Sequence, residues 1–266
     1  MGCLKFQYDV RKLKYPDHVG MDIIGGNEAA PHSRPYMALL ISKKPCGGAL
    51  IKPNWILTAA HCFVDSTSYA ILVAHRRSDT QEQQKLKIKQ VIKYPCYDKF
   101  LMINDLQLLQ LEKPANLNEF VALLPLPKRE ETITAGKICS TAGWGQTDLR
   151  KKTLSDVLRE VNRVILKNME CKEQYSEVNQ SITDSMMCAK GPNNNRKADT
   201  CGGDSGGPLI CHGKYAGIVS FGPNKCGKSK FPGVYTRLTD NYLKWIHNTS
   251  GGDYSDIYIN TTSMRP

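Results

Sequence analysis

Short apolar runs dominate the chain from Ile23 onward, and residues that favour turns separate them. The runs MALLIS, GALI, WILTAA and ILVAH come first, and LQLLQL, ICSTAGW, YAGIVSFG and GVYTRL follow, with Gly, Pro, Asn or Asp between them. Each run has the length of a strand rather than of a helix. No repeat and no alternation with long helical segments accompanies them. The pattern therefore predicts an all-β protein built as a barrel or a sandwich.

One helix is predicted, at residues 240–248 (DNYLKWIHN). Its apolar residues Tyr242, Leu243, Trp245 and Ile246 share one face at helical spacing. We expect this helix to dock on the body of the protein.

The domain organisation predicted from these patterns is a single compact unit over residues 23–250. After it the composition becomes polar and rich in glycine, so residues 251–266 are interpreted as a flexible tail. Residues 1–22 are interpreted as an atypical leader or propeptide, because they lack the apolar stretch of about 7 to 15 residues that a secretory signal carries. No apolar run approaches the roughly 18 residues of a membrane helix, so no transmembrane segment is expected.

Cysteine content and charge bear on the compartment and the partners. The 266 residues include 10 cysteines, which are dispersed along the chain and favour an oxidising compartment. No CxxC pair or histidine cluster suggests a metal, so no metal and no cofactor are expected. The net charge of +11 would attract polyanions. The alternation of Lys85, Lys87, Lys89 and Lys93 fits one face of a strand, either simply solvated or a polyanion-binding strip.

Three local motifs carry candidate chemistry. Ser205 lies among glycines in DTCGGDSGGP, where the backbone can approach a substrate carbonyl closely. His61 ends TAAHC beside a cysteine whose disulfide would fix its position, and Asp105 lies in the apolar run NDLQLL, where a buried carboxylate needs a partner. Taken alone, the loop of Ser205 also fits a plain surface turn. His61 alone also fits a structural histidine, and Asp105 alone fits a solvated aspartate at a strand edge.

Together the motifs give the chain order His, Asp, Ser, which distinguishes chymotrypsin-like enzymes from other serine hydrolases. With IIGG at Ile23 they resemble the trypsin-like serine proteases over residues 23–248. The resemblance implies a chymotrypsin-like double six-stranded antiparallel β-barrel with a C-terminal helix, and a serine endopeptidase. It assigns Ser205 as nucleophile, His61 as general base and acid, and Asp105 as the residue that orients His61. It places the oxyanion hole at the backbone amides of Gly203 and Ser205.

The same resemblance implies a substrate pocket and its preference. Asp199, six positions before Ser205, matches the acid at the floor of the primary pocket, with Ser220, Gly222 and Gly233 around it. A carboxylate there would form a charge-assisted hydrogen bond with a basic side chain. Cleavage after Arg or Lys is therefore expected.

Family members are made as inactive precursors, which implies an activation pair of Ile23 and Asp204. Cleavage before IIGG frees an amino group that pairs with this acid and orders the oxyanion hole. Most trypsin-like precursors carry Arg or Lys before the isoleucine, but the residue here is Asp22. In the granzymes a dipeptide is removed instead, and Met21 with Asp22 would be that dipeptide.

Four disulfides are implied by the family contexts: Cys46–Cys62, Cys139–Cys211, Cys171–Cys188 and Cys201–Cys226. Cys3 and Cys96 are left over. The context YPCYD around Cys96 resembles granzymes, and the resemblance implies a disulfide-linked homodimer through Cys96, with a free thiol as the alternative. Three N-x-S/T triplets are glycosylation candidates, at Asn179, Asn248 and Asn260.

A granzyme-like role implies storage in cytotoxic granules and promotion of target-cell death. The partners would be protein substrates with Arg or Lys at the cleavage site, acidic proteoglycans, and serpin-type or other protease inhibitors. An extracellular mast-cell or plasma protease is one rival interpretation. A catalytically silent or unprocessed protease-fold protein that binds polyanions is the other.

Overall fold

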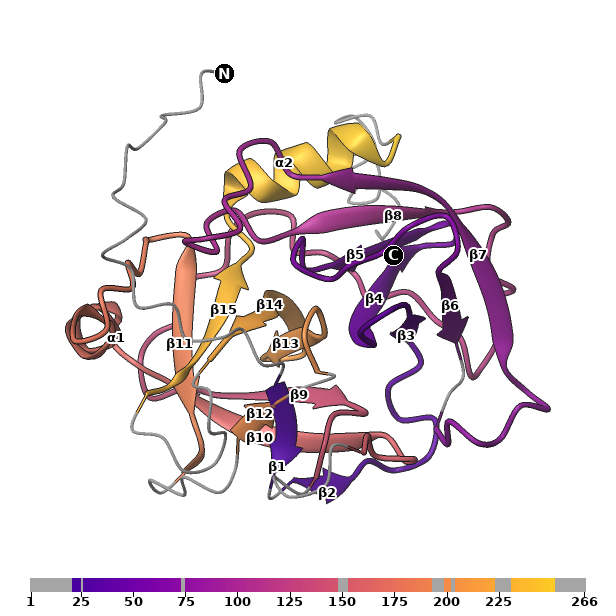
Figure 1. The fold of residues 1–266 in the computed structure, drawn as a ribbon, viewed down its shortest axis with the longest axis horizontal. Helices are drawn as coiled ribbons and strands as arrows, with labels where there is room; N and C mark the ends of the chain where they lie inside the picture. The colour runs from indigo at the N-terminus through magenta and orange to yellow at the C-terminus, as the bar shows by residue number, and fades with distance from the viewer. Residues whose placement is uncertain are drawn as a thin grey trace, which may run out of the picture.

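The chain folds into two β-barrels that lie side by side, with one helix across the top of Figure 1. This computed structural model describes residues 21–24, 26–72, 75–147, 153–192, 199–201, 204–222 and 231–251; the side chains of 21–24 and 199–201 are outside the description. All paired strands in both barrels are antiparallel. The expected chymotrypsin-like double barrel is therefore confirmed.

The first barrel closes in the strand order β3-β4-β5-β8-β7-β6. Its strands are β3 (Met37–Ile41), β4 (Cys46–Lys52), β5 (Trp55–Thr58), β6 (Tyr69–Leu72), β7 (Gln84–Lys93) and β8 (Gln107–Leu111). Full closure leaves no open sheet edge.

The second barrel runs in the order β11-β15-β14-β13-β9-β10 and closes through pairing of β11 with β10. Its strands are β9 (Ile138–Gly143), β10 (Arg159–Ile165), β11 (Met186–Lys190), β13 (Pro208–Cys211), β14 (Lys214–Phe221) and β15 (Gly233–Arg237). The short β2 (Asn27–Glu28) pairs with β10, and β1 (Met21–Ile24) pairs with β12 (Asp199–Cys201).

The apolar runs of the sequence correspond closely to these strands. MALLIS, GALI and WILTAA fall on β3, β4 and β5, and YAGIVSFG and GVYTRL fall on β14 and β15. The alternating lysines lie on β7, and all four are exposed. A register shift between Ile88 and Gln90 interrupts the strict alternation there.

Two helices are present in the described part of the chain. The predicted one is α2 (Asp240–Thr249), whose Tyr242, Leu243 and Ile246 are buried. The other, α1 (Asn168–Ser176), was not predicted, because only Cys171 and Tyr175 are buried and no apolar face marks it in the sequence.

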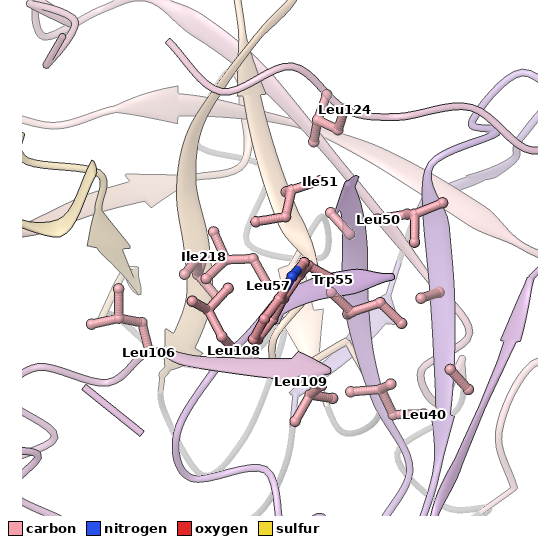
Figure 2. Close-up of a cluster of buried hydrophobic side chains, with 14 of the residues drawn as sticks. Leu40, Leu50, Ile51, Trp55, Leu57, Leu106, Leu108, Leu109, Leu124 and Ile218 are labelled. Carbon is pink, nitrogen blue, oxygen red and sulfur yellow. The ribbon is translucent and has the colours of Figure 1, made fainter. Parts of the chain in front are cut away.

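The largest buried cluster fills the first barrel and extends beyond it. Figure 2 shows Leu57 and Leu108 of this barrel together with Ile218, which comes from β14 of the second barrel. Tyr242 and Ile246 of α2 belong to the same cluster. The C-terminal helix therefore joins the core of the first barrel although it follows the second in sequence.

Three of the four expected intrachain disulfides lie within the described residues and are present: Cys46–Cys62, Cys139–Cys211 and Cys171–Cys188. The fourth, Cys201–Cys226, falls on residues outside the description. Cys96 is itself disulfide-bonded in this structure. A disulfide between two copies through Cys96 stays a prediction and would require thiol–disulfide exchange at this bond.

Within the described residues, neither helix has the length and apolar character needed to cross a membrane.

Leu57 provides a test of the shared core. We expect Leu57→Ala to lower the free energy of unfolding by about 2–5 kcal/mol, because the fully buried side chain would leave a cavity at the contact between the barrels. Urea unfolding with the disulfides intact measures this loss. The matched control is Leu117→Ala, since Leu117 is 43% exposed and its loss should change stability by about 0.5 kcal/mol or less. Equal losses in the two variants would contradict this account of the core.

Candidate active site

Asp105 lies at the junction of the two barrels and is fully buried. It precedes β8, and Asn104 before it adopts a left-handed backbone with φ of 58°, which asparagine tolerates better than most residues. The hydroxyl of Tyr242 in α2 donates to Asn104 Oδ1 at 2.8 Å. The C-terminal helix thus helps to fix the turn that delivers Asp105.

The Asp105 carboxylate holds His61 by two hydrogen bonds. The backbone amide of His61 donates to Oδ1 at 2.9 Å, and the ring Nδ1 lies 2.7 Å from Oδ2. A neutral imidazole that donates from Nδ1 keeps Nε2 free to accept a proton. The side chain of His61 is 22% exposed, so this ring can reach a substrate.

Two residues of the second barrel complete the surroundings of Asp105. Ser220 Oγ on β14 donates to Oδ2 at 2.5 Å, and Thr236 Oγ1 on β15 donates to the Asp105 backbone carbonyl at 3.0 Å. Burial raises the pKa of the Asp105 carboxyl, but the charge of His61 and the hydrogen bonds from His61 and Ser220 outweigh it and lower the pKa below its usual value. The carboxylate is therefore ionised at neutral pH.

Ser205 lies in a tight turn held against both barrels. Its backbone carbonyl accepts from Gly47 of β4 at 2.7 Å, and the amide of Gly206 donates to Val219 of β14 at 2.8 Å. Gly206 has φ of 81°, and a Cβ there would collide with the Thr58 hydroxyl. Only glycine fits this position, which explains the residue after the serine.

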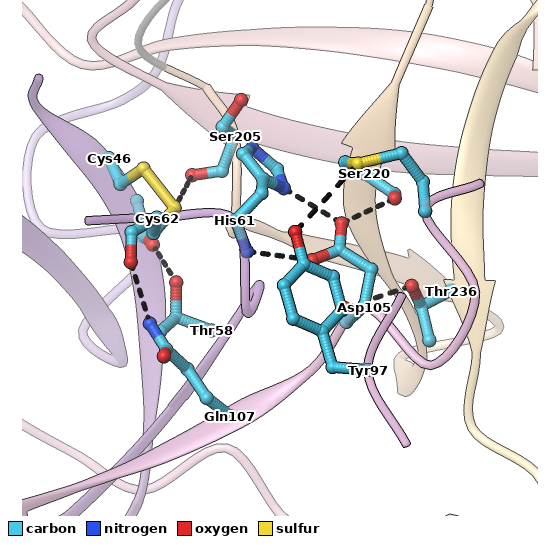
Figure 3. A network of polar contacts seen from close by, with 12 residues as sticks. Cys46, Thr58, His61, Cys62, Tyr97, Asp105, Gln107, Ser205, Ser220 and Thr236 are labelled. Atoms are coloured by element: carbon cyan, nitrogen blue, oxygen red, sulfur yellow. Dashed lines mark hydrogen bonds and ion pairs between the residues drawn. A yellow bond between two sulfur atoms is a disulfide. The ribbon is translucent and has the colours of Figure 1, made fainter. Parts of the chain in front are cut away.

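Figure 3 shows Ser205 beside the imidazole of His61, with Asp105 on the other side of the ring. The disulfide from Cys46 to Cys62 lies beside this group in the figure and anchors the segment that carries His61. Gln107 Nε2 also donates to the Cys62 carbonyl at 3.0 Å. The structure therefore brings together the three residues that the sequence assigned to catalysis.

The expected pocket residues are described only in part. Phe221 pairs with Val234, so Gly222 and Gly233 lie next to each other at the ends of β14 and β15. The backbone of Asp199 lies in β12, opposite Ile24. The side chain of Asp199 and the whole of Gly203 are outside the described residues, so the charged floor of the pocket and the oxyanion hole stay predictions.

Asp204 is fully buried and close to two glycines. The amide of Gly145 donates to its Oδ1 at 3.0 Å, and a Cβ at Gly143 or Gly145 would collide with its carboxylate. Ile23 is described only as part of the backbone of β1. Its pairing with Asp204 after cleavage stays a prediction.

Tyr175 contacts the segments that carry Gly222 and Gly233, and the sequence analysis missed it. Its hydroxyl donates to the Pro232 carbonyl at 2.6 Å, one residue before Gly233. Its ring packs edge-on against Phe221, 5.8 Å between centroids, just before Gly222. Tyr175 thus supports both glycine positions from behind. Its only signal in the sequence is its position four residues after Cys171.

Tyr97 was also missed. The ring of Tyr97 lies beside Asp105 in Figure 3, and its hydroxyl donates to Met102 Sδ at 3.9 Å. Burial together with the charge of Asp105 raises the pKa of the Tyr97 phenol. The phenol of Tyr97 is therefore neutral, and its ring covers one side of the Asp105 carboxylate.

Among the described residues, one group has ligand atoms close enough to suggest a metal: Cys46, His61 and Cys62, within 4.8 Å of one another. Both cysteines are joined in a disulfide, and thiolates are what zinc requires. This group does not fit a metal centre.

The hydrogen bond from Ser220 gives a pH-dependent prediction. At pH 7, Ser220→Ala should lower the free energy of unfolding by about 1–3 kcal/mol, because a buried carboxylate loses a donor. The folded pKa of Asp105 lies below its unfolded value of about 3.9. The charged Asp105 carboxylate therefore contributes its full stabilisation at pH values above the unfolded pKa. This contribution is lost as the pH falls through the folded pKa. Urea unfolding of both proteins between pH 7 and pH 3 should show the difference shrinking on acidification.

The control is Ser78→Ala, which removes a 2.8 Å serine–carboxylate bond to Asp156 at an exposed position. We expect a change of about 0.5 kcal/mol or less. A loss at Ser220 that matches this control, or that is the same at every pH, would contradict the role given to Ser220.

Comparison with known proteins agrees with this geometry. The family model described as Trypsin matches residues 23–246. Granzyme A of Bos taurus is 45% identical over 234 residues, which is 86% of this chain and 88% of that protein. Mast cell protease 3 of Ovis aries is 39% identical over 85% of this chain and 88% of its own length. Glandular kallikrein-10 of Rattus norvegicus is 39% identical over 84% of this chain and 88% of its own length.

The match spans both barrels and includes His61, Asp105 and Ser205 in their expected order. The resemblance found in the motifs is therefore confirmed, and the chain belongs to the trypsin family of serine proteases.

Proposed function

We propose that the protein is a serine endopeptidase that cleaves peptide bonds after Arg or Lys. The observation that supports it most directly is the buried Asp105 carboxylate, which holds His61 with Nδ1 bonded and the opposite edge of the ring turned to Ser205. This is the arrangement that general-base activation of a serine requires.

The proposed chemistry follows the Ser-His-Asp mechanism, for which this family supplies the worked example. Ser205 Oγ attacks the scissile carbonyl while His61 Nε2 takes its proton. His61 then gives this proton to the leaving amine, and the acyl-enzyme is hydrolysed by water through the same steps. Asp105 holds His61 in the tautomer that carries its proton on Nδ1, and it stabilises the imidazolium that forms when Nε2 takes the serine proton. The backbone amides of Gly203 and Ser205 bind the oxyanion.

The preference for Arg and Lys rests on Asp199 together with the glycines at the pocket wall. Gly222 directly follows β14 and Gly233 begins the paired β15. Neither glycine carries a side chain that would narrow the entrance for a long substrate side chain. A carboxylate at the floor would bind a guanidinium or ammonium group by a charge-assisted hydrogen bond.

Activation requires release of an amino group at Ile23. The proposed partner, Asp204, is the residue directly before the nucleophile, and its carboxylate already lies in a buried site formed by Gly143 and Gly145. Residues 1–22 act as the leader, residues 23–250 form the protease domain, and residues 251–266 form a tail without a chemical role.

The proposed setting follows the similarity to granzyme A. The protein would be stored in cytotoxic granules, secreted, and delivered to target cells, whose death it promotes by cleaving their proteins. Its partners would be a second copy linked through Cys96, acidic proteoglycans, and serpin-type or other inhibitors.

A second candidate function, polyanion binding without catalysis, is favoured by one observation. The exposed side chains of Lys85, Lys87, Lys89 and Lys93 lie along β7. Such a row would attract acidic polysaccharides, with a strength that falls as salt rises. This function and proteolysis are compatible, but only proteolysis uses His61, Asp105 and Ser205.

The decisive experiment compares three proteins: the chain trimmed to begin at Ile23, the full-length chain, and the trimmed Ser205→Ala variant. We expect only the trimmed chain with its serine to hydrolyse peptide amides with Arg or Lys at the cleavage site. Matched substrates with Phe or Glu at that position should be poor. Asp199→Asn should lower kcat/KM for the Arg and Lys substrates by about 100-fold or more, because it removes the charge that binds them.

If the folded, trimmed protein hydrolyses none of the substrates, the protease proposal is refuted and polyanion binding is the remaining candidate function. Cleavage of the Phe or Glu substrates in preference would refute only the specificity.

A further inference from the structure

Arg163 lies on the inward face of a barrel strand, where a charged residue is unexpected. Its neighbours on the same face of β10, Val161 and Ile165, are apolar and buried. Arg163 itself is 1% exposed and is among the largest fully buried side chains of the described chain. A guanidinium keeps its positive charge even when buried, so this barrel carries a permanent cation in its interior.

The hydrogen bonds place this cation against the wall of the substrate pocket. Arg163 Nη2 donates to the carbonyl of Ala189 on β11 at 2.7 Å. Ala189 is the register partner of Gly233 on β15. Neighbouring strands are about 4.8 Å apart, so the guanidinium lies about one strand away from the glycine that forms the pocket wall.

The strand that carries the pocket acid also lies nearby. Asp199 belongs to β12, β12 pairs with β1, and β1 contacts β10, which carries Arg163. In Figure 1 the labels of β1, β12 and β10 fall together on the same side of the second barrel. These pairings connect β12 to the barrel that carries Arg163, and the contact of Arg163 with Ala189 places its charge next to the strand of Gly233.

We infer that Arg163 is a specificity-determining residue: its buried positive charge offsets the charge of Asp199 and weakens the pocket's binding of a substrate Arg or Lys. The inference rests on the proposed function, because it concerns the strength of the same pocket. Charges in a poorly screened interior interact over several ångströms strongly enough to change binding about tenfold. Arg163 does not touch the substrate and acts only through the charge balance of the site.

The first test replaces Arg163 with methionine, which keeps much of its length and removes its charge. In the trimmed chain, Arg163→Met should raise kcat/KM for Arg and Lys amides by about tenfold and leave a norleucine amide, which is uncharged, within about twofold. The control, Arg76→Met, is the same change at a position where the side chain is 55% exposed. This control should leave the ratio of basic to neutral substrates unchanged.

A binding measurement separates this inference from the proposed function. In the Ser205→Ala background, calorimetry should show benzamidine, a small cation, binding about tenfold more tightly after Arg163→Met. If the parent protein neither binds benzamidine nor cleaves basic substrates, the proposed specificity fails and this inference fails with it. If the parent does both and Arg163→Met changes the basic and neutral substrates equally, the inference alone is overturned, because a purely structural role would have that effect.

Stability provides a readout that needs no substrate. If the two charges balance each other, Asp199→Asn alone should lower the unfolding temperature more than the double variant Arg163→Met/Asp199→Asn, because the single change leaves a buried charge without its counterion. The inference would be supported equally if Asp199→Asn alone fails to fold and the double variant folds. Additive losses, or a double variant less stable than both single variants, would overturn the inference.

Discussion

The arrangement of the two barrels depends on a carboxylate that neither barrel could bury alone. Asp105 comes from the first barrel, and its donors come from both: the backbone and ring of His61 from the first, and Ser220 from the second. An unpaired charge at this depth would be strongly destabilising. The same strand that carries Ser220 also holds the turn of Ser205 through Val219. One strand of the second barrel therefore fixes both Ser205, the proposed nucleophile, and Asp105, the proposed partner of its base.

Much of this could be predicted from the sequence, because strand-sized apolar runs and compact motifs are local signals. WILTAA became β5, and the order of His61, Asp105 and Ser205 identified the site and, through the resemblance, the double barrel. Features that depend on tertiary contact could not be predicted in this way. The helix α1 has almost no apolar periodicity, and the contact of Tyr175 with Pro232 joins residues 57 positions apart. Arg163 has the pattern of an ordinary polar position until the barrel closes around it.

Polar groups at the junction of the two barrels and the hydrophobic core of the first barrel have different roles. The apolar cluster that includes Leu57, Ile218 and Ile246 favours association of the barrels and the C-terminal helix without strict geometry. Hydrogen bonds such as those of Tyr242 to Asn104 and of Thr236 to the Asp105 carbonyl are directional and set the orientation of Asp105. Apolar burial supplies most of the stability, and these few polar contacts supply the precision that the proposed chemistry needs.

The Cys46–Cys62 disulfide beside His61 has a consequence for the lifetime of the protein in a reducing environment. Cys46 is 4% exposed and Cys62 is 2% exposed, and the sulfur of Cys62 faces the Ser205 carbonyl. Thiol–disulfide exchange requires a thiolate to reach the sulfur atom directly, so a bond at this depth can be attacked only after the surrounding structure opens. Persistence among cellular thiols is then governed by the frequency of opening rather than by the reduction potential of the bond. The catalytic arrangement would consequently remain intact for as long as the two barrels stay closed around it.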